Sequence, residues 1–271
     1  MKIGATIQMV SLELSLGCNL SHIHPQCPNS LGSSRYQLLP RDQKLNHDNA
    51  VGIIKELYDN FDFRGWVGLS FYNEPLLYLD RIISVAKSIR EFAPELKFMI
   101  TTNGTCFPED MSPLKIFDWI GVTNYRDLET PNEEKLDELR NLIGEGTWDP
   151  PHGLFVTNGR LDRRIESNIG VERLHTPCLY PFKDLAIDYY GNCHICCFDW
   201  LGRANVGNIL IDGVAGCMYN WERIVRSITI SPMTDDAPDV CKCCKHVKFK
   251  KLDSINKEAQ QAAKLWLSSH P

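Results

Sequence analysis

The stretch VSLELSLGCNLSHIHPQCPNS, residues 10–30, joins a short alternating apolar run to a loop that contains cysteine and histidine. In residues 10–16, apolar and polar side chains alternate with the period of a β-strand that has two unlike faces. The loop that follows contains Cys18, His22, His24 and Cys27, and all four side chains are of types that bind metals. The stretch therefore predicts a strand that carries a metal-binding loop at its carboxyl end.

Further segments of strand and helix alternate through the first two thirds of the chain. Short apolar runs predict strands, and apolar stripes with helical spacing predict helices. The predicted strands are 10–16, 66–71, 97–102, 119–123 and 153–157, and the predicted helices are 47–61, 76–92, 108–117 and 131–143. This order predicts an α/β fold with a parallel sheet and right-handed crossovers, whose functional groups gather at the carboxyl ends of the strands.

Polar loops follow all five predicted strands. After the loop at 18–30 come FYNEP (71–75), TTNGT (101–105), TNYRD (123–127) and TNGR (157–160). From about Leu174 the sequence changes, and short strands, turns and cysteines are expected, with a hairpin around Gly191-Asn192 in residues 184–200. We therefore divide the chain into residues 1–173, a second unit at 174–252 and a terminal helix within 253–271.

Composition narrows the class of protein. The net charge is −5 without a basic tract, so no nucleic-acid partner is expected. No apolar run approaches about 20 residues and the first residues lack the order of a signal peptide, so we expect a cytoplasmic protein with no membrane partner. Eight of the eleven cysteines fall between Cys178 and Cys244. Clustered thiols in a reducing compartment favour metal binding over disulfides.

Four groups of residues together resemble one family. They are Cys18-Asn19 with Cys27-Pro28-Asn29-Ser30, the run from Phe71 to Leu77, Thr102-Asn103-Gly104, and the late cysteines. Over nearly its whole length the chain resembles radical S-adenosylmethionine (SAM) enzymes with a C-terminal auxiliary-cluster domain of the SPASM/twitch type. Within that family it is most similar to the dehydrogenases that oxidise an alcohol of an aminocyclitol in butirosin biosynthesis.

The resemblance implies a fold and a set of cofactors. The fold would be a partial (β/α)6 barrel with a small C-terminal iron–sulfur domain. The cofactors would be two 4Fe–4S clusters and SAM, with an external electron donor such as flavodoxin or ferredoxin as a partner. Reduction of SAM would give a 5′-deoxyadenosyl radical that abstracts hydrogen from a small polar substrate. Oxidation of a secondary alcohol on a sugar or cyclitol is the first expectation, and epimerisation or peptide modification are alternatives.

The first cluster loop departs from the family pattern, which has three cysteines spaced C-x3-C-x2-C. Here the spacing before Cys27 points to His24 as the third ligand beside Cys18, whereas the spacing after Cys18 points to His22. Imidazole ligands raise the potential of an iron–sulfur centre, while SAM cleavage needs a strong reductant. A histidine-ligated cluster, a labile two-cysteine site and a site without radical chemistry are therefore all open, and we expect Cys18, His24 and Cys27 to be the ligands.

The late cysteines match the second cluster of the family. The resemblance assigns its four ligands to Cys178, Cys196, Cys241 and Cys244 and leaves Cys193, Cys197 and Cys243 over. Strand alternation turns the side chain of Cys197 away from that of Cys196. A structural zinc site with four cysteines also fits this ligand count. The chain could then be an iron–sulfur or zinc binding protein on a retired radical SAM scaffold.

The resemblance also suggests contacts to SAM. FYNEP resembles the family loop in which an acid meets the SAM amino group, and Glu74 is the candidate for that acid. Alternatively, Glu74 is a carboxylate at the N-terminus of a helix, beside Pro75, where the helix dipole favours negative charge. The full set of candidate SAM-binding residues is Tyr72, Asn73, Glu74, Asn103, Asn124 and Arg160. No catalytic residue is assigned from the sequence.

Overall fold

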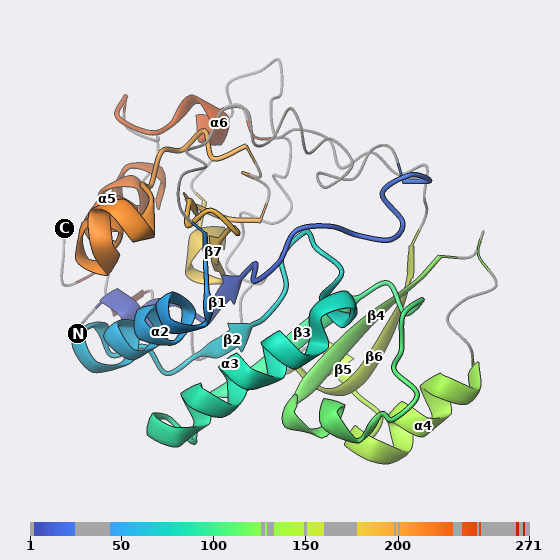
Figure 1. Ribbon diagram of the computed structural model, residues 1–271. Helices are drawn as coiled ribbons and strands as arrows, with labels where there is room; N and C mark the ends of the chain where they lie inside the picture. Colours follow the sequence, from blue (N-terminus) through green and yellow to red (C-terminus); the bar gives the residue numbers. More distant parts are fainter. Residues whose placement is uncertain are drawn as a thin grey trace.

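The computed structural model describes residues 3–24, 44–125, 128, 133–148, 151–159, 178–197, 199, 201–229, 235–242, 244, 264–265 and 268. Its centre is one eight-stranded sheet with the order β5-β6-β4-β3-β2-β1-β7-β8 (Figure 1). The strands are β1 Met9–Leu12, β2 Trp66–Gly68, β3 Lys97–Thr102, β4 Trp119–Tyr125, β5 Thr147–Trp148, β6 Pro151–Gly159, β7 Leu185–Ile187 and β8 Cys193–His194.

Six of these strands form the parallel part of the sheet. Strands β6, β4, β3, β2, β1 and β7 each run parallel to their neighbours, while β5 and β8 pair antiparallel at the two edges. Strand β7 comes from the second unit of the sequence and yet lies beside β1. The predicted parallel α/β sheet is therefore confirmed, and the second unit contributes a strand to it.

The helices connect the parallel strands. The α-helices are α2 His47–Phe61, α3 Leu79–Phe92, α4 Glu133–Ile143, α5 Ile209–Thr229 and α6 Asp239–Lys242, and the short 3-10 helices are η1 Ile3–Thr6, η2 Pro75–Tyr78, η3 Ser112–Ile116 and η4 Tyr180–Phe182. Helices α2, α3 and α4 lie along one side of the sheet (Figure 1). Each turns an apolar stripe inward, as the 3.6-residue period requires.

Alternation along the strands gives the sheet two different faces. Side chains such as Val10, Leu12, Val67, Ile100 and Val122 are buried in the core with the apolar stripes of the helices. The opposite face, which we call the inner face, carries the small or hydroxyl-bearing residues Ser11, Gly68, Thr101, Gly121, Thr123 and Thr157 among larger ones such as Met99, Trp119 and Phe155. Parallel strands covered on both faces usually form continuous apolar runs. The hydroxyl-bearing residues of the inner face depart from that pattern.

Helix α5 corrects the sequence prediction. Residues after Leu174 were expected to form short strands and turns, but Ile209–Thr229 form a helix with a non-helical residue, Gly213, at φ 70°. After this kink the buried residues Val214, Cys217, Met218 and Trp221 repeat at helical spacing. Their stripe is part of the core, and the Trp221 ring meets Phe182 of η4 edge to face. Burial of this stripe outweighs the helix-breaking tendency of the glycines.

Other predicted boundaries shift by a few residues. Helix α2 and strand β3 have the predicted bounds, and β7 and β8 form the predicted hairpin around Gly191-Asn192. Strand β1 ends at Leu12, and the strand β5, which pairs with the start of β6, was not predicted. Most of the predicted terminal helix, as well as Cys27, Arg160 and Cys243, lies outside the described residues.

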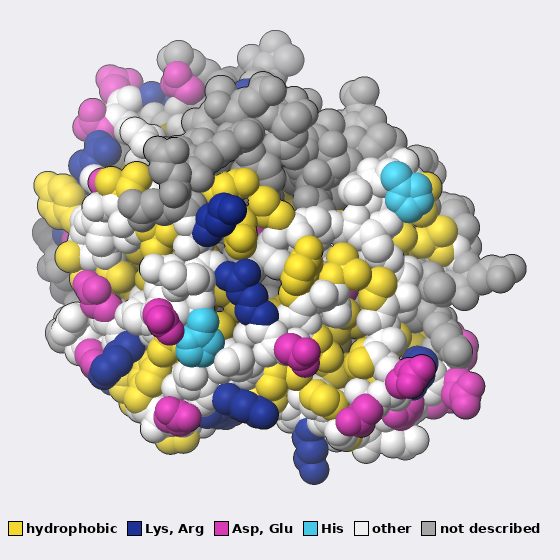
Figure 2. Space-filling model, viewed as in Figure 1, with side chains coloured by type: hydrophobic (Ala, Val, Ile, Leu, Met, Phe, Trp, Pro, Cys, Tyr) yellow, Lys and Arg dark blue, Asp and Glu magenta, His cyan; other side chains and the backbone are white. Residues whose placement is uncertain are grey.

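On the described part of the face that Figure 2 presents, basic and acidic side chains both lie among apolar ones. Within the described part of the chain, no helix combines the length and the apolar character that crossing a membrane requires.

Candidate functional site

The loop after β1 places Cys18 next to the loop after β3. The side-chain amide of Asn103 donates to Cys18 Sγ at 3.5 Å and to Asn19 Oδ1 at 2.9 Å. The backbone N–H of Glu74 donates to the Gly17 carbonyl at 2.9 Å, so the loop after β2 joins the same group. Three of the predicted polar loops therefore meet at one edge of the sheet, as expected for the carboxyl ends of parallel strands.

The two histidines of the first loop differ in exposure. His22 is exposed, whereas His24 is only 7% exposed and its ring lies 5.6 Å from the ring of Tyr125 at the end of β4. A metal ligand on this loop would have to face the interior of the strand-end group, and His24 is the histidine that does so. The described residues do not include Cys27, so ligation by Cys18, His24 and Cys27 stays a prediction.

Glu74 connects two loops through a buried carboxylate. Its Oε1 accepts from the Thr102 hydroxyl at 2.6 Å and from the Leu76 N–H at 3.1 Å, and its Oε2 accepts from the Asn103 N–H at 2.8 Å. Burial raises the pKa of Glu74 in spite of these donors, which lower it. The residue also caps η2, which agrees with the alternative reading from the sequence. Its contact with the SAM amino group stays a prediction.

The other candidate SAM residues lie in the same loops. The Tyr72 hydroxyl donates to the Cys197 carbonyl, and the Asn73 amide donates to Ser15 Oγ at 2.8 Å. Asn124, at the end of β4, is in register with Asn158 of β6. Tyr72, Asn73 and Asn103 therefore all make hydrogen bonds that hold this edge of the protein together. Arg160 lies outside the described residues.

The four predicted ligands of the second cluster line one cavity. Cys178, Cys196, Cys241 and Cys244 share its wall with apolar residues and Asp199. We call this space the cysteine cavity. Burial raises the pKa of Cys196 well above its usual range, and the neighbouring thiols Cys197, Cys241 and Cys178 raise it further. Thiols that oppose each other's ionisation in this way are suited to a site where a metal centre supplies the compensating positive charge.

The spacing of these thiols bears on the kind of metal centre. Among the residues that the structure describes, no three His, Cys, Asp or Glu side chains come close enough together to share one metal ion. A 4Fe–4S cluster makes a different demand, because each of its four thiolates binds a different iron. Four cysteines around one cavity match the number of thiolates that such a cluster takes, so the donor set fits a 4Fe–4S cluster.

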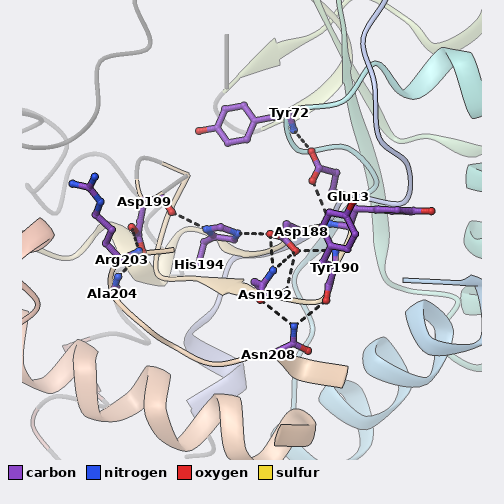
Figure 3. Close-up of polar contacts among 11 residues, drawn as sticks. Glu13, Tyr72, Asp188, Tyr190, Asn192, His194, Asp199, Arg203, Ala204 and Asn208 are labelled. Atoms are coloured by element: carbon purple, nitrogen blue, oxygen red, sulfur yellow. Dashed lines mark hydrogen bonds and ion pairs between the residues drawn. The ribbon is translucent and has the colours of Figure 1, made fainter. Parts of the chain in front are cut away.

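A buried polar network holds the chain that leads into the cysteine cavity (Figure 3). His194 is fully buried, with Nδ1 2.7 Å from the Asp199 carbonyl and Nε2 3.3 Å from Asp188 Oδ2. Since a carbonyl only accepts, Nδ1 of His194 donates to Asp199, and Nε2 pairs with the Asp188 carboxylate, which also accepts from Tyr190 and Asn192. Pairing with a carboxylate favours the protonated form of the His194 ring, which lies two residues before Cys196.

Cys196 and Cys197 face different spaces. Cys196 faces the cysteine cavity, whereas Cys197 lines a second cavity of about 150 Å³ against the inner face of the sheet. We call this second space the sheet cavity. Its wall also includes Ser11, Tyr180 and Asp184. The prediction that the Cys197 side chain turns away from that of Cys196 is consistent with this arrangement.

Several residues of the site were not singled out from the sequence. Glu13 is 1% exposed and accepts from the Tyr72 and Tyr189 N–H groups, and Ser11 donates to Asp184 Oδ1 at 2.8 Å. The alternation of VSLELSL already places Ser11 and Glu13 on one face, so that signal was present. Asp184 and His194 carry no comparable sequence signal, because a single acid or histidine is usually exposed or structural.

The comparison with solved structures found proteins similar to this chain. No family model matches the sequence, and no curated protein is significantly similar to it. The chain is similar to the crystal structure of BtrN in complex with AdoMet and 2-DOIA, with a TM-score of 0.61, 18% identity and coverage of 90% of this chain and 95% of BtrN. It is also similar to SeMet BtrN in an open conformation, with a TM-score of 0.58, 17% identity and coverage of 90% and 94%. The two proteins therefore share a fold.

The buried network gives a testable prediction on stability. Asp188→Asn should lower the free energy of unfolding by about 3 kcal/mol, because it leaves the His194 imidazolium buried without its counter-charge. The exposed Asp235→Asn should change it by less than about 0.5 kcal/mol. Urea unfolding of both variants measures the difference, and equal stabilities would show that His194 is neutral in the folded protein.

Proposed function

We propose that this protein is a radical SAM enzyme that abstracts hydrogen from a small polar substrate and oxidises a secondary alcohol on it. The observation that carries the proposal is the pair of sites on one sheet. The Cys18 loop meets the loops of Glu74 and Asn103 at a strand-end edge, and four cysteines line the cysteine cavity. The shared fold with a protein that was crystallised with AdoMet supports the same reading.

The residues of the chain have separable roles in this proposal. Cys18, His24 and Cys27 would hold the first cluster, and Cys178, Cys196, Cys241 and Cys244 would hold the second. SAM, when bound at a reduced cluster, supplies the 5′-deoxyadenosyl radical. The loops fastened by Glu74 and Asn103 fix the position of Cys18, and the sheet cavity would give the substrate a place against the inner face. An external reductant such as flavodoxin or ferredoxin would complete the reaction.

The decisive experiment is anaerobic reconstitution of the full chain with iron and sulfide, followed by addition of SAM and a strong reductant. We expect about eight iron and eight sulfide per chain, the content of two 4Fe–4S clusters, and formation of 5′-deoxyadenosine. Stoichiometric zinc without sulfide would favour the binding-protein alternative. That alternative rests on His24, since a histidine in the first loop raises the potential that SAM cleavage must overcome.

Adjacent cysteines provide a matched pair for the second cluster. Cys196→Ser should lose about half of the bound iron and sulfide, because it removes a thiolate from the cysteine cavity. Cys197→Ser should keep the full content, because its side chain lines the sheet cavity. Iron and sulfide analysis with visible absorption measures both. If the two variants lose the same amount of iron, the assignment of Cys196 as a ligand is wrong.

The two histidines of the first loop form a second matched pair. His24→Ala should lose the first cluster, whereas the exposed His22→Ala should keep it. His24→Cys should lower the midpoint potential of that cluster and raise the rate of 5′-deoxyadenosine formation, because a thiolate adds negative charge that an imidazole lacks. Electron paramagnetic resonance during a redox titration gives both readouts. The reverse result for the two alanine variants would assign His22 as the ligand.

A further inference from the structure

The side-chain amide of Asn103, in the loop after β3, has a defined orientation. Its Oδ1 accepts from the Thr105 backbone N–H at 3.0 Å. A backbone N–H can only donate, so this bond identifies the oxygen end of the amide and places the Nδ2 end on the other side. Asn103 is also buried, with 7% of its surface exposed. The amide therefore presents its two N–H donors to a fixed place in the structure.

The Nδ2 donors of Asn103 reach Cys18, a proposed ligand of the first cluster. They donate to Cys18 Sγ at 3.5 Å and to Asn19 Oδ1 at 2.9 Å. Asn19 Nδ2 donates to the Thr105 hydroxyl at 2.6 Å, and that hydroxyl donates to Asn103 Oδ1 at 2.6 Å. The three side chains form a closed ring of hydrogen bonds, which keeps one amide N–H directed at the sulfur.

The backbone of Asn103 is held independently of its side chain. Its N–H donates to the buried Glu74 Oε2 at 2.8 Å, and the Thr102 hydroxyl beside it donates to Glu74 Oε1 at 2.6 Å. These bonds persist when the side chain at position 103 is changed. A substitution there can therefore remove the donor to Cys18 without releasing the loop that carries it.

The contact with Cys18 suits a metal-bound thiolate. A thiol sulfur is a weak acceptor, whereas hydrogen bonds to ionised acceptors are stronger, and the thiolate is the form that binds metals. The N–H of Asn103 therefore gains a stronger partner when Cys18 holds iron. His24, the other described candidate ligand of this loop, is also turned inward, with 7% of its surface exposed. Both residues fit the first cluster.

A donor at a ligand sulfur affects the two oxidation states of a cluster differently. Reduction adds an electron, part of whose negative charge resides on the sulfur ligands. A hydrogen bond to the more negative sulfur is stronger, so the donor stabilises the reduced state. Hydrogen bonds to the sulfurs are for this reason among the factors that set the potential of an iron–sulfur cluster.

We propose that Asn103 raises the reduction potential of the first cluster by donating its amide N–H to the Cys18 thiolate. This inference rests on the proposed function for the presence of that cluster, but not for SAM cleavage or for any substrate. An imidazole ligand at His24 acts in the same direction. The first cluster of this chain would then have two features that make it easier for an external donor to reduce.

Redox titration of the reconstituted full chain, followed by electron paramagnetic resonance, tests the proposal. The signal that Cys18→Ala loses identifies the first cluster. Asn103→Ala removes the donor, and Asn103→Asp replaces it with an anionic oxygen but keeps an acceptor for Thr105. Both should reduce the equilibrium constant for reduction of the first cluster by at least threefold, about 28 mV for a one-electron couple, and Asn103→Asp should have the larger effect.

Thr105→Val is the matched control. It removes a hydroxyl from the same ring but keeps the Thr105 N–H that orients the Asn103 amide. We expect the potential of the first cluster to stay unchanged in this variant. The second cluster provides an internal reference in every sample, because its potential should not move in any of the three variants.

Each other outcome contradicts the role of Asn103. The proposal is overturned by a potential that stays the same or rises in both Asn103 variants, or by an equal shift in Thr105→Val. Loss of the first cluster from both Asn103 variants would show that the side chain is needed for assembly, and absence of a first-cluster signal from the unmodified chain would remove the basis of the proposal.

The result is separable from that for the proposed function. Unchanged potentials together with formation of 5′-deoxyadenosine would leave the proposed reaction standing and reject the role of Asn103. The expected shift in potential without any 5′-deoxyadenosine would reject the proposed reaction and leave the role of Asn103 standing.

Discussion

The polar side chains that β1 and its continuation turn inward hold the two units of the chain together. Glu13 is the central one, because its buried carboxylate accepts from Tyr72 in the loop after β2 and from Tyr189 in the turn after β7. Ser11 and Ser15 extend the row with bonds to Asp184 and Asn73. A buried carboxylate is tolerated only where such donors surround it. This requirement fixes the loop of the candidate SAM residues relative to the segment that leads to the cysteines.

The sequence predicts most of the sheet, because the features involved are local. Helix α2 and strand β3 have a clear period and match their predicted bounds, and the Gly191-Asn192 turn marks the hairpin of β7 and β8. Helix α5 was missed because glycines and a cysteine interrupt an apolar stripe that only the core makes evident. The placement of β7 beside β1 depends on contacts between distant segments, which no local pattern encodes.

The candidate site likewise contains features that the sequence predicts and features that depend on contacts between distant segments. The family resemblance assigns Cys178, Cys196, Cys241 and Cys244 as one ligand set, and the structure gathers these four around one cavity. Two other cysteines, Cys193 and Cys217, are buried free thiols whose side chains share a hydrogen bond elsewhere in the second unit. The roles of Asp184 and Asp188 are evident only from the structure, which shows that both are buried and bonded to Ser11 and His194, respectively. A resemblance to a family motif predicts ligands that act as a set, but it does not predict a single acid whose role depends on where the chain folds back.

The cysteine cavity and the sheet cavity are lined by two consecutive residues, Cys196 and Cys197. This adjacency bears on the proposed oxidation. Cys196 and Cys197 line different spaces, and adjacent Cα atoms are about 3.8 Å apart. The Tyr72 hydroxyl donates to the Cys197 carbonyl, which fixes this junction to the loop after β2. An alcohol that loses a hydrogen atom must then lose an electron and a proton to become a ketone. In the proposed reaction, an electron acceptor in the cysteine cavity would lie next to the sheet cavity on the side of Cys197. The His194 ring, paired with Asp188, would then lie two residues from the proposed ligand Cys196. A purely structural metal site would need no such adjacency, so the arrangement supports the redox role proposed for a centre held by these cysteines.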